Sequence, residues 1–216
     1  MKRHDLIFLE SEGREYAAAA ARKNHPTLEP EFINQIIVGD KIPGIIKRQE
    51  NMEADEIAVG FSTCHYTSGG ARIRLSSEVP RKFVRALMSP FKVFEKAGSM
   101  GIYSEVSELR KNGNIMIGLF GSSALEAVTG QPYRNKNSDV DLYVKVRQNA
   151  GSSLREFARD IGEVEKKHRV CFDIEVECWE NYGIKMKELL SEQKTVLAKG
   201  LYDVQIFMRD EVLQWM

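Results

Sequence analysis

The sequence has few of the features that mark secreted, disulfide-rich or membrane-spanning proteins. It contains three cysteines in 216 residues, Cys64, Cys171 and Cys178, and no CxxC pair. This excludes a disulfide framework and the usual zinc or redox motifs, and it favours buried, reduced thiols at Cys171 and Cys178. The apolar run at residues 6–9 is too short for a signal peptide, and no stretch approaches the ~18 apolar residues of a transmembrane helix. We therefore expect a cytoplasmic protein without a membrane partner.

An excess of charge of one sign is also missing. The chain has 31 basic and 31 acidic side chains and a formal net charge of zero. General binding to a nucleic-acid polymer needs a large basic excess, so no such partner is predicted. A local basic stretch does occur at residues 72–96, with seven basic and two acidic side chains. Its pattern favours a solvated surface over a phosphate-binding role.

The first half of the chain predicts a small mixed unit. Short apolar runs at residues 6–9, 32–38 and 56–61 are typical of strands or short helices, and residues 16–24 are rich in helix formers. Residues 79–97 carry aromatic and aliphatic side chains at three- and four-residue spacing. This spacing predicts an amphipathic helix, or a helix pair broken at Pro90.

The second half alternates strand and helix patterns. The predicted strands are residues 115–120, 139–146 and 169–179, with one or two more between residues 195 and 211. The predicted helices are residues 104–112, 123–130 and 152–168. We expect an α/β (α+β) protein with a smaller N-terminal accessory, substrate-binding domain at residues 1–97. A catalytic domain with a mixed sheet flanked by helices follows at residues 98–216.

Two features of the second half carry chemistry. Gly121 and Ser122 follow a buried strand and precede a helix, where free N–H groups and a close backbone approach favour a phosphate. Asp139 and Asp141 are two residues apart on a strand, so they point to one face and are suited to hold a hard cation such as Mg²⁺. Asp173 or Glu175 on the next strand is the candidate third ligand, and the sequence does not choose between them.

The four histidines are scattered, and no Ser-His-Asp pattern occurs. The order of the remaining motifs is more specific than any one of them. Phe120-Gly121-Ser122, then Ser138-Asp139-Val140-Asp141-Leu142, then Phe172-Asp173-Ile174-Glu175 resembles the nucleotidyltransferase superfamily.

A narrower resemblance rests on the segment between the first two motifs. Thr129-Gly130-Gln131-Pro132-Tyr133 is not part of the general superfamily pattern, and it resembles the phosphoribosyl-dephospho-CoA transferases, the holo-acyl-carrier-protein synthases of malonate decarboxylase. Looser matches are Arg3-His4-Asp5-Leu6, Ile57-Ala58-Val59-Gly60 and Val196-Leu197-Ala198-Lys199. The chain departs from the family in having Phe61-Ser62-Thr63-Cys64-His65 where an arginine-rich stretch is usual, and Ile174 where glycine is usual.

The resemblance implies a substrate, an acceptor and roles for the site residues. The substrate is triphosphoribosyl-dephospho-CoA, and its phosphoribosyl-dephospho-CoA group passes to a serine of the acyl-carrier subunit of malonate decarboxylase with release of diphosphate. Asp139 and Asp141 are then catalytic and hold Mg²⁺, with Asp173 or Glu175 as a further ligand. Gly121, Ser122 and Lys199 bind substrate phosphate.

Two alternatives remain open from the sequence. The same core is compatible with a nucleotidyltransferase that uses ATP or another triphosphate on a different protein or small-molecule acceptor. It is also compatible with a catalytically silent module that binds a nucleotide or a carrier protein. The retained carboxylates argue against a silent module, because clustered like charges cost folding free energy.

Overall fold

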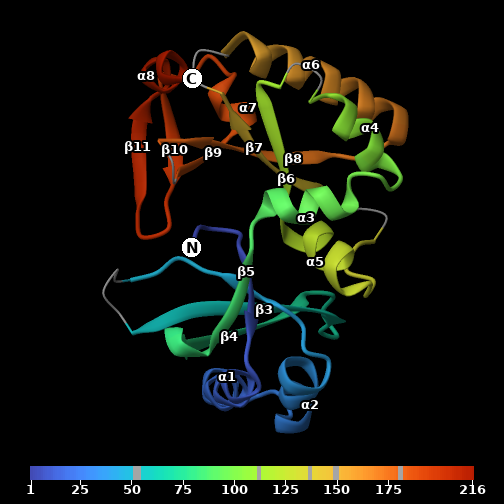
Figure 1. Ribbon diagram of the computed structural model, residues 1–216, viewed down its shortest axis with the longest axis vertical. Helices are drawn as coiled ribbons and strands as arrows, with labels where there is room; N and C mark the ends of the chain where they lie inside the picture. Colours follow the sequence, from blue (N-terminus) through green and yellow to red (C-terminus); the bar gives the residue numbers. More distant parts are fainter. Residues whose placement is uncertain (51–54, 111–112, 136–137, 148–150, 180–181) are drawn as a thin grey trace.

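The chain forms two β-sheets stacked one above the other, with helices between them and on their outer sides (Figure 1). The computed structural model describes residues 1–50, 55–110, 113–135, 138–147, 151–179 and 182–216. The two sheets have separate hydrophobic cores. The predicted mixed α/β fold is therefore confirmed.

The first sheet is antiparallel between all its neighbouring strands, in the order β4-β3-β2-β1-β5. Its outer face is covered by α1, which buries Ala17, Ala18 and Ala21 and lies beside α2 in Figure 1. The strands are β1 (Leu6–Leu9), β2 (Gly44–Ile46), β3 (Glu56–Tyr66), β4 (Arg72–Pro80) and β5 (Val84–Met88). The helical segments are α1 (Ser11–Asn24), α2 (Pro30–Asn34), a π-helical turn (Gln35–Gly39) and a 3-10 turn (Arg81–Phe83).

The second sheet is mixed, in the order β11-β10-β9-β8-β7-β6. Strands β7 and β8 are parallel, and the other neighbours are antiparallel. The strands are β6 (Ile115–Leu119), β7 (Val140–Val146), β8 (Phe172–Cys178), β9 (Tyr182–Lys185), β10 (Thr195–Lys199) and β11 (Val204–Met208). The helices are α3 (Pro90–Ala97), α4 (Ile102–Glu108), α5 (Gly121–Thr129), α6 (Gly151–His168), α7 (Met186–Leu189) and α8 (Arg209–Trp215).

The strands and helices predicted in the second half are confirmed in their main parts. The helix predicted over residues 104–112 ends at Glu108, and residues 111–112 lie outside the described residues. The strands predicted between residues 195 and 211 end at Met208, where α8 follows.

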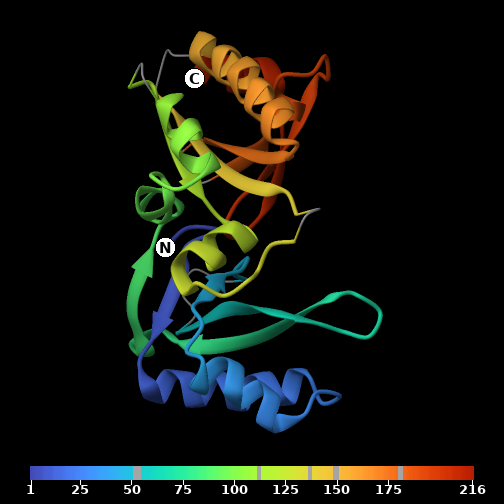
Figure 2. The same ribbon diagram turned by 90° about the vertical axis from the view of Figure 1, so that its right-hand side faces the viewer.

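The parallel pair β7 and β8 needs a long crossover, and α6 supplies it on the outer face of the sheet (Figure 2). Helix α5 lies on the opposite side, between the two sheets (Figure 2). Gly130 ends α5 in the left-handed conformation at φ 72°, as its position predicts. The sheet and α5 together place the start of α5 beside the first residues of β7.

The helix predicted over residues 79–97 is wrong for its first part. Residues 84–88 form β5 and pair with β1, so tertiary pairing outweighs the helical spacing of their side chains. Pro90 begins α3 instead of breaking a helix, because its fixed φ and missing N–H suit the first helical position. Ser89 caps this helix by accepting a hydrogen bond from the Lys92 N–H at 3.4 Å.

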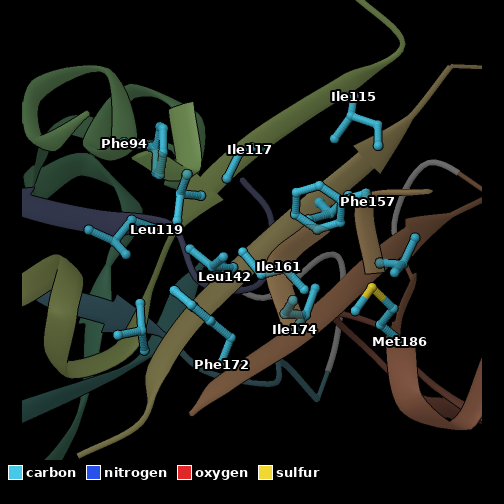
Figure 3. Close-up of a cluster of buried hydrophobic side chains, with 14 of the residues drawn as sticks. Phe94, Ile115, Ile117, Leu119, Leu142, Phe157, Ile161, Phe172, Ile174 and Met186 are labelled. Atoms are coloured by element: carbon cyan, nitrogen blue, oxygen red, sulfur yellow. The ribbon is translucent and has the colours of Figure 1, made fainter. Parts of the chain in front are cut away.

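Buried side chains join the two sheets into one structure. Figure 3 shows the second core, in which Ile117, Leu142 and Phe157 come from β6, β7 and α6. Strand β1 contributes Leu6 to this core and Ile7 to the first core, because successive strand residues point to opposite faces. Helix α3 also packs in the second core. The domain division at residue 97 stays a prediction.

The cysteines are free, as predicted, but they differ in exposure. Cys178 is buried in the second core, and burial raises the pKa of its thiol to about 12. Cys171 is exposed, contrary to the prediction. It lies just before β8, and its backbone carbonyl accepts a hydrogen bond from the Val140 N–H. Among the described residues, no helix has both the length and the apolar character needed to cross a bilayer.

Candidate active site between the two sheets

A cavity of about 620 Å³ lies between the two sheets. From the second sheet it is lined by Gly121 and Ser122 at the start of α5 and by Asp139 and Asp141 at the start of β7. The structure thus brings together four of the site residues that the sequence predicts. The volume is within the range usual for pockets that bind small molecules and cofactors.

Gly121 is required by the shape of this corner. Its φ is +63°, and a Cβ at this position would overlap the carboxylate of Asp141, coming within 2.8 Å of its Cγ. The Phe120 N–H donates to the Asp141 carbonyl at 3.1 Å, which fixes the two segments together. The side chain of the N-cap residue, Phe120, makes no capping hydrogen bond, so the first N–H groups of α5 are available to an anion at the cavity.

The carboxylates on β7 lie in an environment that disfavours their charge. Asp139 is exposed, whereas Asp141 is half-buried and lies directly opposite Asp173 in the parallel pairing of β7 and β8. Burial, followed by the negative charges of Asp173 and Asp139, raises the pKa of Asp141 to about 6, although Lys185 opposes this shift. A cation bound at Asp139 and Asp141 would relieve this repulsion.

The structure distinguishes the two candidates on β8. Asp173, the neighbour of Asp141, forms an ion pair with Lys185 of β9. Glu175 lies deeper, 5% exposed, with its Oε2 2.9 Å from His4 Nε2 and 3.4 Å from Arg3 Nη1. Burial alone would raise the pKa of Glu175, but the hydrogen bond with His4 and the charges of His4 and Arg3 outweigh it and lower the pKa to about 2. Asp173 is therefore the neighbour of Asp141 on the next strand, although it does not line the cavity and its carboxylate is paired with Lys185.

The residues fit a magnesium ion that takes some of its ligands from the protein and the others from the substrate and water. In the described part of the chain, no three His, Cys, Asp or Glu side chains are grouped to hold a metal on their own. Mg²⁺ is commonly bound through one or two carboxylates, with phosphate oxygens and water completing its shell. Asp139 and Asp141 would supply the carboxylates, and the phosphates would lie in the cavity that these two residues line.

Lys199 is not brought to this cavity. It lies on β10, separated from β7 by β8 and β9, and its carbonyl accepts a hydrogen bond from Arg3 Nη1 at 2.8 Å. Successive strands are about 4.8 Å apart, so roughly 14 Å of sheet lies between β10 and β7. The phosphate-binding role of Lys199 is not supported by this placement.

The first sheet supplies basic side chains to the cavity, including two from the 72–96 stretch, for which the sequence pattern predicts a solvated surface. Arg72 and Arg74 of β4 line the cavity, together with Lys47, which directly follows β2. The other basic residues of the 72–96 stretch do not line it. Arg74 on β4 pairs in register with Ser62 on β3, two residues after Gly60. Lys47 and Lys185 were missed because only strand pairing brings them near the acidic residues.

Arg72 connects the first sheet to the segment that follows α5. Its guanidinium donates to the Thr63 carbonyl at 2.8 Å, to the Tyr66 hydroxyl at 2.7 Å and to the Tyr133 carbonyl. The guanidinium carbon also lies 4.9 Å from the ring centroid of Tyr66 and 5.7 Å from that of Tyr133. Tyr133 is fully buried. The Thr-Gly-x-Pro-Tyr segment therefore anchors one side of the cavity to the other.

The fold and the cavity define a class of enzyme. A helix N-terminus and paired aspartates at one corner of a mixed sheet form a nucleotidyltransferase-like site, built to transfer a phosphate-linked group. A scan against protein families then matches residues 89–210, more than half of the chain, to the Phosphoribosyl-dephospho-CoA transferase MdcG C-terminal domain. The chain belongs to this family, and it is a transferase for the phosphoribosyl-dephospho-CoA group in malonate decarboxylase. Searches of curated proteins and of solved structures returned no match.

Proposed function

We propose that the protein takes triphosphoribosyl-dephospho-CoA as its substrate and a serine of the acyl-carrier subunit of malonate decarboxylase as its acceptor. The serine Oγ forms a bond to the α-phosphorus, the bond from that phosphorus to the diphosphate breaks, and the serine proton is released to solvent. Family membership supports the transferred group. The observation that carries the proposal is that Gly121 and Ser122 line the same cavity as Asp139 and Asp141.

Phosphoryl transfer depends mainly on positioning and charge neutralisation, and the site is suited to both. The N–H groups at the start of α5 bind and orient the triphosphate, with the Ser122 hydroxyl as a further donor. Asp139 and Asp141 hold Mg²⁺, with Asp173 as the candidate third carboxylate. The bound ion would lower the pKa of the attacking hydroxyl and neutralise the leaving diphosphate. We propose a cytoplasmic location on the sequence grounds given above.

The test is intact-protein mass spectrometry of the apo carrier subunit after incubation with this protein and Mg²⁺. Separate reactions contain triphosphoribosyl-dephospho-CoA or ATP, and an Asp139→Ala variant is the matched control. We expect a mass gain equal to phosphoribosyl-dephospho-CoA with the wild-type protein only. A nucleotide adduct from ATP alone would replace the proposal with general nucleotidyl transfer. No adduct from either donor would contradict the proposed acceptor or indicate a binding module.

A further inference from the structure

The first sheet presents a polar floor to the cavity. Gly60 and Ser62 of β3 lie on one face of the sheet, because they are two residues apart. In the pairing of β3 with β4, Gly60 lies opposite Ser76 and Ser62 lies opposite Arg74. These four residues line the cavity. These four positions of the floor are therefore small residues and one guanidinium, and Ile45, Phe61 and Leu75 add apolar residues to the lining from the same sheet.

Lys47 adds a second cation to this floor. A Cβ at Gly60 would lie 3.4 Å from Cγ and Cδ of Lys47, so the lysine side chain runs across the glycine. Lys47 and Arg74 are exposed. Neither forms an ion pair or a side-chain hydrogen bond with any of the residues that the structure describes. Both cationic groups are thus available to a ligand.

Arg72, two residues before Arg74, also lines the cavity but is not available to a ligand in the same way. Its guanidinium donors are engaged with Thr63, Tyr66 and Tyr133. Arg72 fixes the position of the β3 and β4 hairpin, whereas Arg74, two residues later on the same face, has no such bonds to the described part of the chain. Two available cations opposite two aspartates give the cavity a basic side and an acidic side.

We propose that Lys47 and Arg74 bind a diphosphate group of the substrate on the basic side of the cavity. Arginine binds phosphate through paired N–H donors, and lysine adds a compact positive charge. The inference rests on the proposed function, in which the substrate carries two such groups. One is the β,γ-phosphate pair of the triphosphate arm, and the other is the diphosphate bridge of the dephospho-CoA arm.

The test is calorimetric titration of the full chain with inorganic diphosphate in buffer of about 0.15 M ionic strength containing EDTA. We expect Lys47→Gln and Arg74→Gln each to raise the Kd about tenfold. Arg85→Gln is the matched control, because Arg85 is exposed on β5 of the same sheet, does not line the cavity and has the same charge. Its Kd should stay within about twofold of wild type, as expected for a distant, screened charge.

Competition identifies the source of the diphosphate group. Displacement of inorganic diphosphate by dephospho-CoA assigns Lys47 and Arg74 to the CoA arm, and displacement by inorganic triphosphate alone assigns them to the triphosphate arm. The proposal would be overturned if Lys47→Gln and Arg74→Gln bound diphosphate as tightly as wild type, or if Arg85→Gln weakened binding as much as they do. It would also be overturned if neither dephospho-CoA nor inorganic triphosphate displaced the diphosphate. The titration needs neither carrier nor turnover. A missing mass gain on the carrier therefore counts against the acceptor, whereas these outcomes count against the diphosphate site.

Discussion

The two sheets contribute to the cavity in different ways. The second sheet places its site residues within short sequence motifs. Gly121 and Ser122 begin α5, one residue after the end of β6, and Asp139 directly precedes β7, in which Asp141 is the second residue. The first sheet contributes side chains from separate strands, with Lys47 after β2 and Arg74 on β4. The acidic side of the site is therefore encoded locally, and the basic side arises from strand pairing.

We infer that the two sides of the cavity have different roles. The acidic side lies within residues 89–210, the part of the chain that matches the family, and the basic side lies before it. We infer that substitutions on the acidic side affect turnover most strongly, whereas substitutions on the basic side affect the affinity for phosphate.

Asp139→Ala and Asp141→Ala should each reduce transfer at least about a thousandfold, because each removes a carboxylate that we propose as a ligand of the cation. The melting temperature in metal-free buffer should stay the same or rise, since like-charge repulsion is reduced. Carrier mass spectrometry and thermal unfolding measure the two effects. Asp210→Ala on α8, which removes an exposed carboxylate outside the cavity, is the control. Near-normal turnover in either variant would contradict the assignment of the metal site.

Gly121→Ala should reduce transfer about a hundredfold, because the added methyl group displaces the Asp141 carboxylate. Gly113→Ala is a close control: Gly113 has the same φ of +63°, but a Cβ at that position would have nothing within 4 Å. Both variants carry the same backbone strain. Equal losses of transfer would show that strain, and not the contact with Asp141, is responsible.

Arg72→Gln should lower the free energy of unfolding by about 2 kcal/mol. The carbonyls of Thr63 and Tyr133 and the Tyr66 hydroxyl all lose a charged hydrogen-bond donor. Arg74→Gln should change stability by less than about 0.5 kcal/mol while weakening diphosphate binding. Urea denaturation of both variants compares them directly. A similar loss of stability in both would remove the distinction between an anchoring and a binding arginine.

Asp141→Asn should stabilise the metal-free protein in a pH-dependent way. The folded-state pKa of Asp141, about 6, lies above the ordinary value of 3.8. The charged form therefore costs stability, and this cost grows as pH rises from about 4 to 6 and is complete above 6. After allowance for solvent screening we expect the variant to gain about 1 kcal/mol at pH 7 and almost nothing at pH 4. Urea midpoints at both pH values measure it, and a gain that is the same at both would contradict the shifted pKa.

The sequence could predict the second sheet much better than the first. The strand and helix alternation that leads from Ile115 to His168 follows local hydrophobic patterns. The sequence also predicts a carboxylate from the next strand near Asp141, and the parallel pairing of β7 with β8 puts Asp173 beside Asp141. The surroundings of Glu175 could not be predicted. Its partners Arg3 and His4 are more than 170 residues away from it along the chain.

The first sheet illustrates why local patterns fail. Residues 84–88 have a helical spacing of side chains, but they are paired with β1 from the start of the chain. Arg74 belongs to a basic stretch that has the composition of a solvated surface, and only its register opposite Ser62 places it in the cavity. The role of Lys199 in binding phosphate stays a prediction, because Lys199 lies on β10, two strands away from β7, and does not line the cavity.

The contacts of Arg3 and His4 with Glu175 also affect how quickly the site can assemble. They span 172 and 171 residues, and the bond from Arg3 to the Lys199 carbonyl spans 196. Contacts between residues so distant in sequence carry a large loop-closure entropy and slow the folding of a protein. Glu175 obtains its positive partners only when the two ends of this span meet. Refolding should therefore show Glu175 reaching its native environment among the last events.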